Sequence, residues 1–338
     1  MNPIEIRKKI LDLMPEFSGV ATYEREGTLL YEEAFGEKIP GEDLPIKPGT
    51  AFPTASGCKI FTAVAILKLV EKGEISLGSS VNGILPDTFP HMAHEVTAFH
   101  LLTHTSGFRD YFDEAENDDF SGIWSSLPMY SIKTPWDFLP LLRDKTMEFT
   151  PGERFKYNNG GYVILSMIIE KISGMSFPEF VSENIFLPAG MFSSGYFPLD
   201  SLPVNAVLGY TDDGHGGLKS NIYAVPIMGG GDGGAYTTAS DMSLFWKALL
   251  KGGLLSEETV KLMCTPHVQV SSESLHYGLG VWMETDKEKP LKLFVTGGDP
   301  GVSFRSIYRL KDESICTVLC NRDNGSYDAT LILEENFL

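Results

Sequence analysis

The stretch PTASGCK at residues 53–59, followed by the apolar run 60–70, constrains the fold more than any other part of the sequence. Pro53 discourages an earlier helix start and serine is favoured at a helix N-terminus, so the pattern predicts a buried helix that begins at Ser56. Lys59 follows one turn later on the same face. A neighbouring lysine of lowered pKa can take the proton of a serine hydroxyl, and the free N–H groups of a helix start suit an oxyanion. The stretch therefore predicts Ser56 as a nucleophile with Lys59 as its partner.

This pattern has a simpler interpretation. A Ser-x-x-Lys arises about once by chance in a chain of ordinary composition and this length. The alternative is a capped amphipathic helix whose lysine faces water. Other parts of the chain must therefore decide between a catalytic pair and a helix cap.

The net charge of the chain makes some classes of binding partner unfavourable. The chain has 338 residues, of which 43% are hydrophobic and 21% charged, as in ordinary globular proteins. Its 27 basic and 45 acidic residues give a net charge of −18, which repels nucleic acid and anionic membranes. We expect a small-molecule or peptide-like substrate as the partner, with no nucleic acid and no membrane span.

The first residues and the cysteines bear on the compartment. No apolar run follows the basic cluster at residues 7–9, so the given chain shows no secretory signal and predicts a cytoplasmic location. If a leader was removed, the location would be extracytoplasmic. The four cysteines show no paired spacing, apart from Cys316 and Cys320 on one expected strand. We expect free thiols.

The order of the expected elements predicts an α+β fold. A helix over 3–14 and a hairpin that turns near Gly27 precede the Ser56 helix, and glycine at position 73 ends that helix. The middle is mostly helical, with one helix over 161–173 that Gly174 ends and another over 177–187 that Pro188 closes. Further helices are expected over 241–251 and 256–264. Four strands follow at 277–283, 291–295, 303–308 and 314–319, which favours an antiparallel sheet. We expect one lobe from 1–75 and 220–338, with an inserted mainly helical lobe from 76–219.

Three further features have structural interpretations. The acidic run at 110–121 is typical of a solvated loop. The glycine-rich stretch 229–234 lacks the lysine and the strand of a phosphate-binding loop, so we expect a close backbone turn. His100 and His104 lie four residues apart, but no third metal ligand is evident. We therefore predict no metal site.

Two more motifs complete a recognisable series. Tyr157-Asn158-Asn159 follows the Ser-x-x-Lys, and Thr296-Gly297-Gly298 follows the strand expected at 291–295. With LLTHTSG at 101–107, PGERF at 151–155 and GGDPG at 297–301, this order resembles the serine β-lactamase and penicillin-binding-protein superfamily, especially its class C β-lactamase, D-alanyl-D-alanine carboxypeptidase and esterase members. The resemblance covers nearly the whole chain. It implies a β-lactamase/transpeptidase-like fold in which helices flank an antiparallel sheet.

The resemblance also implies roles for individual residues. Ser56 would form an acyl-enzyme, Lys59 would deprotonate it or tune its neighbour, and Tyr157 would serve as general base or relay. Asn159 would hold Lys59 and the substrate, and Thr296 and Gly297 would line the substrate site. The N–H groups of Ser56 and Gly298 would form the oxyanion hole. Such a serine hydrolase of amides, β-lactams or esters needs no cofactor.

One position departs from the family pattern. The family usually has lysine or histidine before the Thr-Gly pair, and this chain has Val295. The missing cation would bind a substrate carboxylate and tune the tyrosine, and the sequence leaves open whether Arg305 on the next strand replaces it. We therefore expect a neutral ester or amide substrate rather than efficient penicillin hydrolysis. The alternative is a weakly active or non-catalytic protein that binds a ligand in the same cleft.

Overall fold

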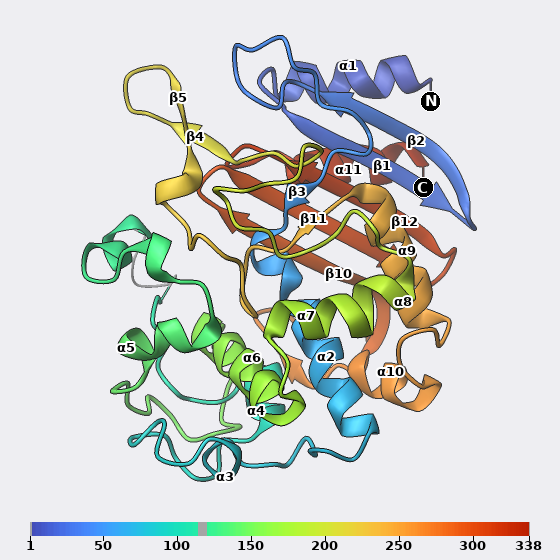
Figure 1. Ribbon diagram of the computed structural model, residues 1–338. Coiled ribbons are helices and arrows are strands. Elements are labelled where there is room, and N and C mark those ends of the chain that lie inside the picture. The colour runs from blue at the N-terminus through green and yellow to red at the C-terminus, as the bar shows by residue number, and fades with distance from the viewer. Residues whose placement is uncertain (1, 114–119, 338) are drawn as a thin grey trace.

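The computed structural model describes residues 2–113 and 120–337, and its centre is an antiparallel sheet built from both ends of the chain (Figure 1). The strand order is β2-β1-β12-β11-β10-β9-β8-β7, and β1 pairs with β12 so that Gly19 lies opposite Cys320. The strands of this sheet are β1 (Gly19–Arg25), β2 (Thr28–Phe35), β7 (Val268–Gln269), β8 (Leu275–Tyr277), β9 (Trp282–Asp286), β10 (Lys289–Asp299), β11 (Val302–Arg309) and β12 (Ser314–Cys320).

Short strand pairs and helices make up the rest of the described fold. Two-stranded sheets join β3 (Phe52–Pro53) to β6 (Tyr236–Thr237) and β4 (Tyr210–Asp212) to β5 (Leu218–Ser220). The α-helices are α1 (Pro3–Leu13), α2 (Lys59–Glu71), α3 (Val81–Ile84), α4 (Ala98–Leu102), α5 (Leu139–Leu142), α6 (Asn159–Ser173), α7 (Phe177–Val181), α8 (Leu187–Ala189), α9 (Ala239–Leu250), α10 (Glu257–Met263) and α11 (Ser326–Phe337). The 3-10 helices are η1 (Ala55–Cys58), η2 (Phe120–Ser125), η3 (Met129–Ser131), η4 (Pro135–Phe138) and η6 (Asn221–Tyr223), and η5 (Ser182–Phe186) is a π-helix.

The two faces of the large sheet have separate cores. On one face, apolar residues of α1 and α11, including Ile6, Ile10 and Leu333, pack against strand residues such as Val318. On the other face, α2 and α9 pack against the sheet and α6 packs against α2. Helix α2 is buried on nearly all sides, because ten of its thirteen residues are buried. The predicted buried helix is thus confirmed, and it lies between the sheet and the helices of the middle segment (Figure 1).

The predicted α+β arrangement of an antiparallel sheet flanked by helices is confirmed. The hairpin near Gly27 and the helix stops at Gly73 and Gly174 also agree with the structure, since these glycines have φ values of 79°, 72° and 71°. Figure 1 shows the mainly helical middle beside α2. The lobe boundaries at 75/76 and 219/220 stay a prediction.

Three local predictions were wrong or incomplete, and one helix was missed. The expected strand 277–283 is interrupted, because Gly280 takes a φ of 79° and the N–H of Gly278 bonds to the carbonyl of Val281. The expected helix 177–187 passes through η5 into α8, and Gly190, not Pro188, ends it with a φ of 76°. Ser56 lies within the 3-10 helix η1 rather than at the start of α2. Helix α11 was not predicted.

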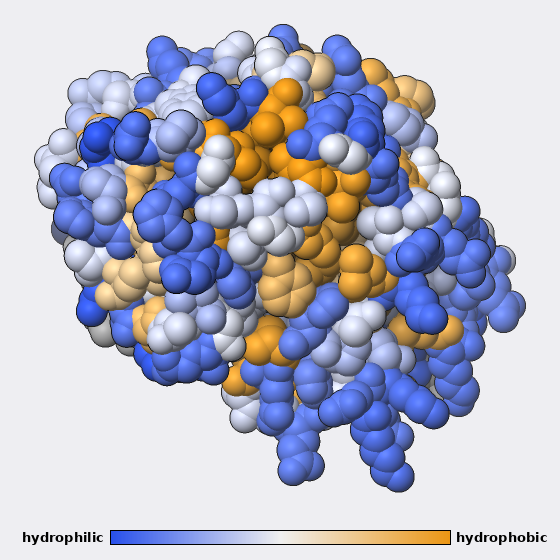
Figure 2. All heavy atoms as spheres, turned by 90° about the horizontal axis from the view of Figure 1, so that it is seen from below, coloured by the Kyte–Doolittle hydropathy of each residue, from blue (hydrophilic) through white to orange (hydrophobic). Residues whose placement is uncertain are grey.

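The surface is mixed in polarity. Seen from below, hydrophobic residues form an interrupted band that hydrophilic residues surround (Figure 2). Across the described ranges, no helix combines the length and the apolar composition that crossing a bilayer would require.

Candidate active site

Ser56 lies on a sharp turn between β3 and α2. Ala55, just before it, has a φ of 46°, which costs a non-glycine residue about 1–3 kcal/mol and persists only when the surrounding structure enforces it. Here the N–H and the hydroxyl of Thr54 both donate to the carbonyl of Ala235, at 2.8 and 2.9 Å. Residues 57–59 are buried, whereas Ser56 is partly exposed. The turn thus presents the serine at the surface of an otherwise buried segment.

Lys59 connects the first two sequence motifs. Its side chain is 3% exposed, and its Nζ donates to Ser56 Oγ at 2.8 Å, to Asn159 Oδ1 at 2.8 Å and to the carbonyl of Asp232 at 2.6 Å. The Asn159 and Asp232 oxygens can only accept, whereas the Ser56 hydroxyl can also donate, so this geometry suits Lys59 both as a charged donor and as a neutral base for Ser56. The structure therefore excludes the alternative in which the lysine points to water, and it places Ser56, Lys59 and Asn159 together as predicted.

Tyr157 lies beside this group. The centre of its ring is 5.0 Å from Lys59 Nζ, and the ring stacks on Trp282 at 6.2 Å between centroids. On another side its ring meets that of His104 at 4.4 Å. Tyr157 therefore belongs to the same cluster as Ser56 and Lys59, within an aromatic surround.

The third motif lies directly against the serine turn. A Cβ atom at Gly297 would stand 2.2 Å from the carbonyl oxygen of Thr54 and 2.8 Å from the backbone nitrogen of Ser56, so β10 approaches the turn where only glycine fits. Gly298 is the next residue of the strand, and Thr296 donates its hydroxyl to the carbonyl of Phe304 at 3.1 Å. The strand thus brings Gly297 to Ser56, and Gly298 follows at the same strand end.

Arg305 does not replace the cation missing at Val295. Val295 is 3% exposed and belongs to the core on the α2 face of the sheet. The guanidinium of Arg305 lies over the rings of Phe294 and Tyr327, at 4.4 and 5.1 Å. Phe294 belongs to the core of the opposite face, and Tyr327 is on α11. The question that the sequence left open is therefore answered: Arg305 faces away from the serine.

The glycine-rich stretch 229–234 forms the close turn predicted for it, and it also forms part of the site. The N–H of Gly230 bonds to the carbonyl of Gly233, and a Cβ at Gly229 would stand 2.5 Å from the carbonyl oxygen of Gly234. Two carbonyls of this turn accept from α2: Asp232 from Lys59, and Gly231 from Thr62 at 2.6 Å. Sequence analysis missed this contribution, because a carbonyl acceptor leaves no mark on residue type.

The acidic run is not a solvated loop where the structure describes it. The carboxylate of Asp110 accepts the N–H groups of Asn159 and Gly160, at 2.5 and 2.8 Å, at the start of α6. Burial raises the pKa of Asp110 to about 7. Asp113 pairs with Lys156 at 2.6 Å. The remaining acidic residues of the run, namely Glu114, Glu116, Asp118 and Asp119, lie outside the described residues.

The two histidines have other contacts than a metal. His100 Nδ1 accepts the N–H of Thr97 in a capping box at the start of α4. His104 is 1% exposed and its Nδ1 accepts the N–H of Asn158 at 3.1 Å. Within the described residues, no group of three histidine, cysteine or acidic side chains could hold a metal ion. All four cysteines are free thiols, as predicted, and burial raises the pKa of the Cys58 thiol to about 12.

A pocket opens beside Ser56 and Asn159. It encloses about 690 Å³ of empty space, part of it open to solvent, and apolar residues such as Tyr111, Phe138 and Met228 line much of it. Its charged lining residues are Asp232 and Asp299, and the described lining contains no lysine, arginine or histidine. The Tyr111 hydroxyl donates to Asp232 Oδ2 at 2.6 Å. The pocket is thus apolar with a negative character next to the serine.

Comparison with known proteins gives a consistent result. A family model described as Beta-lactamase matches residues 9–336. The penicillin-binding protein 4* of Bacillus subtilis is 31% identical over 332 residues, which cover 94% of this chain and 71% of that protein. A D-aminopeptidase of Brucella canis is 26% identical over 321 residues, or 93% of this chain and 58% of that protein.

A solved structure agrees over the full length. The crystal structure of a penicillin-binding protein from Bacillus halodurans superimposes with a TM-score of 0.93 at 41% sequence identity, and the match covers 98% of this chain and 99% of that one. The fold that the sequence motifs imply is therefore the fold of these proteins.

Proposed function

Since the chain belongs to the Beta-lactamase family of serine hydrolases, we propose that it transfers the acyl group of an ester, amide or β-lactam to water through an acyl-enzyme on Ser56. The observation that carries this proposal is the contact of Lys59 Nζ with both Ser56 Oγ and Asn159 Oδ1, each at 2.8 Å. A serine hydroxyl becomes a nucleophile when a neighbouring base takes its proton. The contact supports the proposal because it joins the Ser-x-x-Lys motif to Asn159 at the amine that would take the serine proton.

The proposed reaction has two halves. Ser56 Oγ attacks the substrate carbonyl, its proton passes to Lys59 or Tyr157, and the same group gives a proton to the leaving group. Water then attacks the acyl-enzyme by the reverse route and releases the acid. The N–H groups of Ser56 and Gly298 would stabilise the oxyanion in both halves, which is supported by the close approach of Gly297 to the backbone nitrogen of Ser56.

Charge in the pocket supports a substrate class. Asp232 and Asp299 line the pocket, and the described lining carries no basic side chain. Val295 is an apolar core residue and Arg305 faces the other side of the sheet. Because like charges repel strongly where water is partly excluded, we propose neutral or amine-bearing esters and amides as substrates, and penicillins, which carry a carboxylate, as poor ones.

A ligand-binding protein without turnover is the second candidate. The observation that favours it is Val295, since the family cation that would tune Tyr157 is replaced by a buried apolar side chain. Among the described residues, Lys59 still lies near the tyrosine ring, with its Nζ 5.0 Å from the ring centre. Turnover decides between the two candidates.

The test is the pre-steady-state time course of a nitrophenyl ester with the wild type and with Ser56→Ala, each with and without penicillin. We expect a burst in the wild type, no burst in the variant, and little protection by penicillin. Ser271→Ala, which changes an exposed serine outside the pocket lining, should keep the burst. Equal slow hydrolysis by wild type and Ser56→Ala would contradict an acyl-enzyme and favour the binding protein.

A further inference from the structure

His104 has an unusual place in the fold. It follows the last turn of α4, its side chain is 1% exposed, and its φ is 57°. A non-glycine residue rarely adopts this left-handed conformation unless tertiary contacts impose it. The conformation brings the backbone carbonyl and the imidazole of one residue to the same neighbouring segment.

That neighbouring segment carries Tyr157. The carbonyl of His104 accepts the N–H of Lys156 at 2.9 Å, and its Nδ1 accepts the N–H of Asn158 at 3.1 Å. The imidazole also faces the ring of Tyr157, with 4.4 Å between the ring centroids. His104 therefore holds the residue before Tyr157, the residue after it, and the tyrosine ring.

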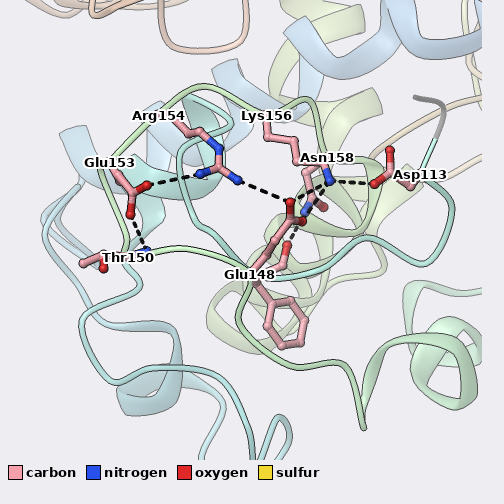
Figure 3. A network of polar contacts seen from close by, with 8 residues as sticks. Asp113, Glu148, Thr150, Glu153, Arg154, Lys156 and Asn158 are labelled. Carbon is pink, nitrogen blue, oxygen red and sulfur yellow. Dashed lines mark hydrogen bonds and ion pairs between the residues drawn. The ribbon is translucent and has the colours of Figure 1, made fainter. Parts of the chain in front are cut away.

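Tyr157 has no regular element of its own to fix it, since residues 154–158 precede α6 without helix or strand structure. The side chains on either side are anchored elsewhere. Lys156 pairs with Glu148 and Asp113, as Figure 3 shows. The amide of Asn158 donates to the carbonyl of Phe108. These contacts fix the side chains of Lys156 and Asn158, while His104 fixes the backbone on both sides of Tyr157.

The protonation state of His104 fits this arrangement. Nδ1 accepts a hydrogen bond, so the proton of the neutral ring is on Nε2, which is buried without a hydrogen-bond partner among the described residues. Burial, with a smaller contribution from the charge of Lys59, holds the pKa of His104 well below its usual range. Tyr157, Tyr162, Tyr277 and Phe155 surround the ring. The imidazole is therefore a neutral acceptor within an aromatic cluster.

We infer that His104 is a positioning residue for the reaction: it sets the place of the Tyr157 hydroxyl relative to Ser56 and Lys59 by accepting the N–H of Asn158. The inference rests on the proposed role of Tyr157 in proton transfer. His104 does not touch the reacting atoms. Displacement of a catalytic group by about 1 Å can reduce the rate about 100-fold, so the effect should be kinetic as well as structural.

The test compares three variants at this position. His104→Leu removes the acceptor, His104→Gln moves it one carbon farther from the backbone, and His104→Asn keeps an acceptor near the place of Nδ1 in a residue that tolerates a left-handed φ. With a nitrophenyl ester, we expect kcat to fall at least about tenfold for the leucine and glutamine variants, with KM within about twofold. The asparagine variant should stay within about threefold of the wild type. His100→Leu, a matched change four residues earlier, should leave kcat unchanged.

The burst amplitude and crystal structures distinguish a displaced Tyr157 from partial unfolding of the variant. The burst amplitude counts the folded sites, so partial unfolding lowers the amplitude, whereas misplacement of Tyr157 lowers the rate constant per site. In crystals, the Tyr157 hydroxyl should be displaced in the leucine or glutamine variant and retained in the asparagine variant. The inference is overturned if Tyr157 keeps its position in the leucine or the glutamine variant that folds. It is also overturned if the asparagine variant restores neither kcat nor the position of Tyr157. Equal slow hydrolysis by the wild type and Ser56→Ala would instead refute the proposed function. The crystallographic comparison does not depend on turnover, so it would still test the position of Tyr157.

Discussion

At the scale of single residues, Val295 and Lys59 define what is unusual here. Lys59 is held by Ser56, Asn159 and the carbonyl of Asp232, while the position that usually supplies a second cation is apolar and buried. Among the described residues, Lys59 is therefore the lysine near the Tyr157 ring on which the proposed proton transfers depend. The described lining of the pocket carries the carboxylates of Asp232 and Asp299 and no basic side chain.

The first prediction concerns Asp299, which lines the pocket. Asp299→Asn removes a negative charge, so kcat/KM for an ester with a carboxylate in its acyl group should rise about 3- to 10-fold relative to a neutral ester of the same shape. The ratio of the two kcat/KM values is the measurement. Asp286→Asn, an exposed aspartate at the end of β9, is the control. An unchanged ratio in Asp299→Asn would show that this carboxylate does not select against anions.

At the scale of elements, the fit between η1 and β11 fixes the serine turn. A Cβ at Gly57 would stand 2.2 Å from the ring of Phe304 on β11, and Phe304 is fully buried. No contact of this closeness can be relieved without movement of the ring or of the turn. Gly57 in the motif is thus explained by packing rather than by its φ.

The second prediction tests this fit. Gly57→Ala should destabilise the fold by about 1–3 kcal/mol through overpacking and slow acylation of Ser56. Combining it with Phe304→Leu should recover part of the loss, with a coupling energy of about 0.5–3 kcal/mol in denaturant unfolding. Gly49→Ala, where a Cβ meets nothing within 4 Å, should change stability by less than about 0.5 kcal/mol. Additive effects of the two changes would disprove the contact.

The start of α6 gives a third prediction, which concerns pH. Burial raises the pKa of Asp110 to about 7 from the ordinary 3.8, so between these values the unfolded chain has lost a proton that the folded chain keeps. The contribution of Asp110 to stability therefore falls as pH rises from about 4 to about 7 and stays constant above that.

Asp110→Asn removes this titration, but its amide nitrogen cannot accept an N–H, so it loses one of the bonds from Asn159 and Gly160 at every pH. Its melting temperature should lie below that of the wild type at pH 4 and should gain on the wild type as pH rises to 7. Thermal unfolding of both proteins across this range is the measurement. A wild type that gains on Asp110→Asn with rising pH would show that hydrogen bonds from Asn159 and Gly160 outweigh burial.

At the scale of the whole molecule, the chain ends complete the sheet that supports the site. β1 pairs with β12, α1 contacts α11, and both helices cover the face opposite α2. β10, which brings Gly297 to Ser56, lies in the same sheet. The integrity of the α11 face should therefore govern global stability, while the site geometry depends on contacts of the other face.

The fourth prediction uses two leucines of α11. Leu333 is fully buried and Leu331 is 42% exposed. Leu333→Ala should lower the free energy of unfolding by about 2–5 kcal/mol, whereas Leu331→Ala should change it by less than about 0.5 kcal/mol. The acylation rate per folded site should stay unchanged in both variants. A loss of rate per site in Leu333→Ala would contradict the separation of the two faces.

Most of the elements in chain order and the series of motifs could be predicted from the amino-acid sequence. Ser56 and Lys59 lie one turn apart in any helical segment, and glycine at positions 27, 73 and 174 marks turns and helix ends that the structure contains. These features depend on local spacing and backbone freedom, which a sequence records directly. The resemblance carried by three motifs then fixed the fold class.

Tertiary structure alone decided the remainder. The carbonyl of Asp232, the carboxylate of Asp110 and the imidazole of His104 meet the motifs from distant parts of the chain. The direction of Arg305 depended on which face of β11 meets α11. Such contacts follow from how strands and helices pack after long loops close, and neither residue type nor spacing encodes a backbone carbonyl or a left-handed φ at a particular histidine.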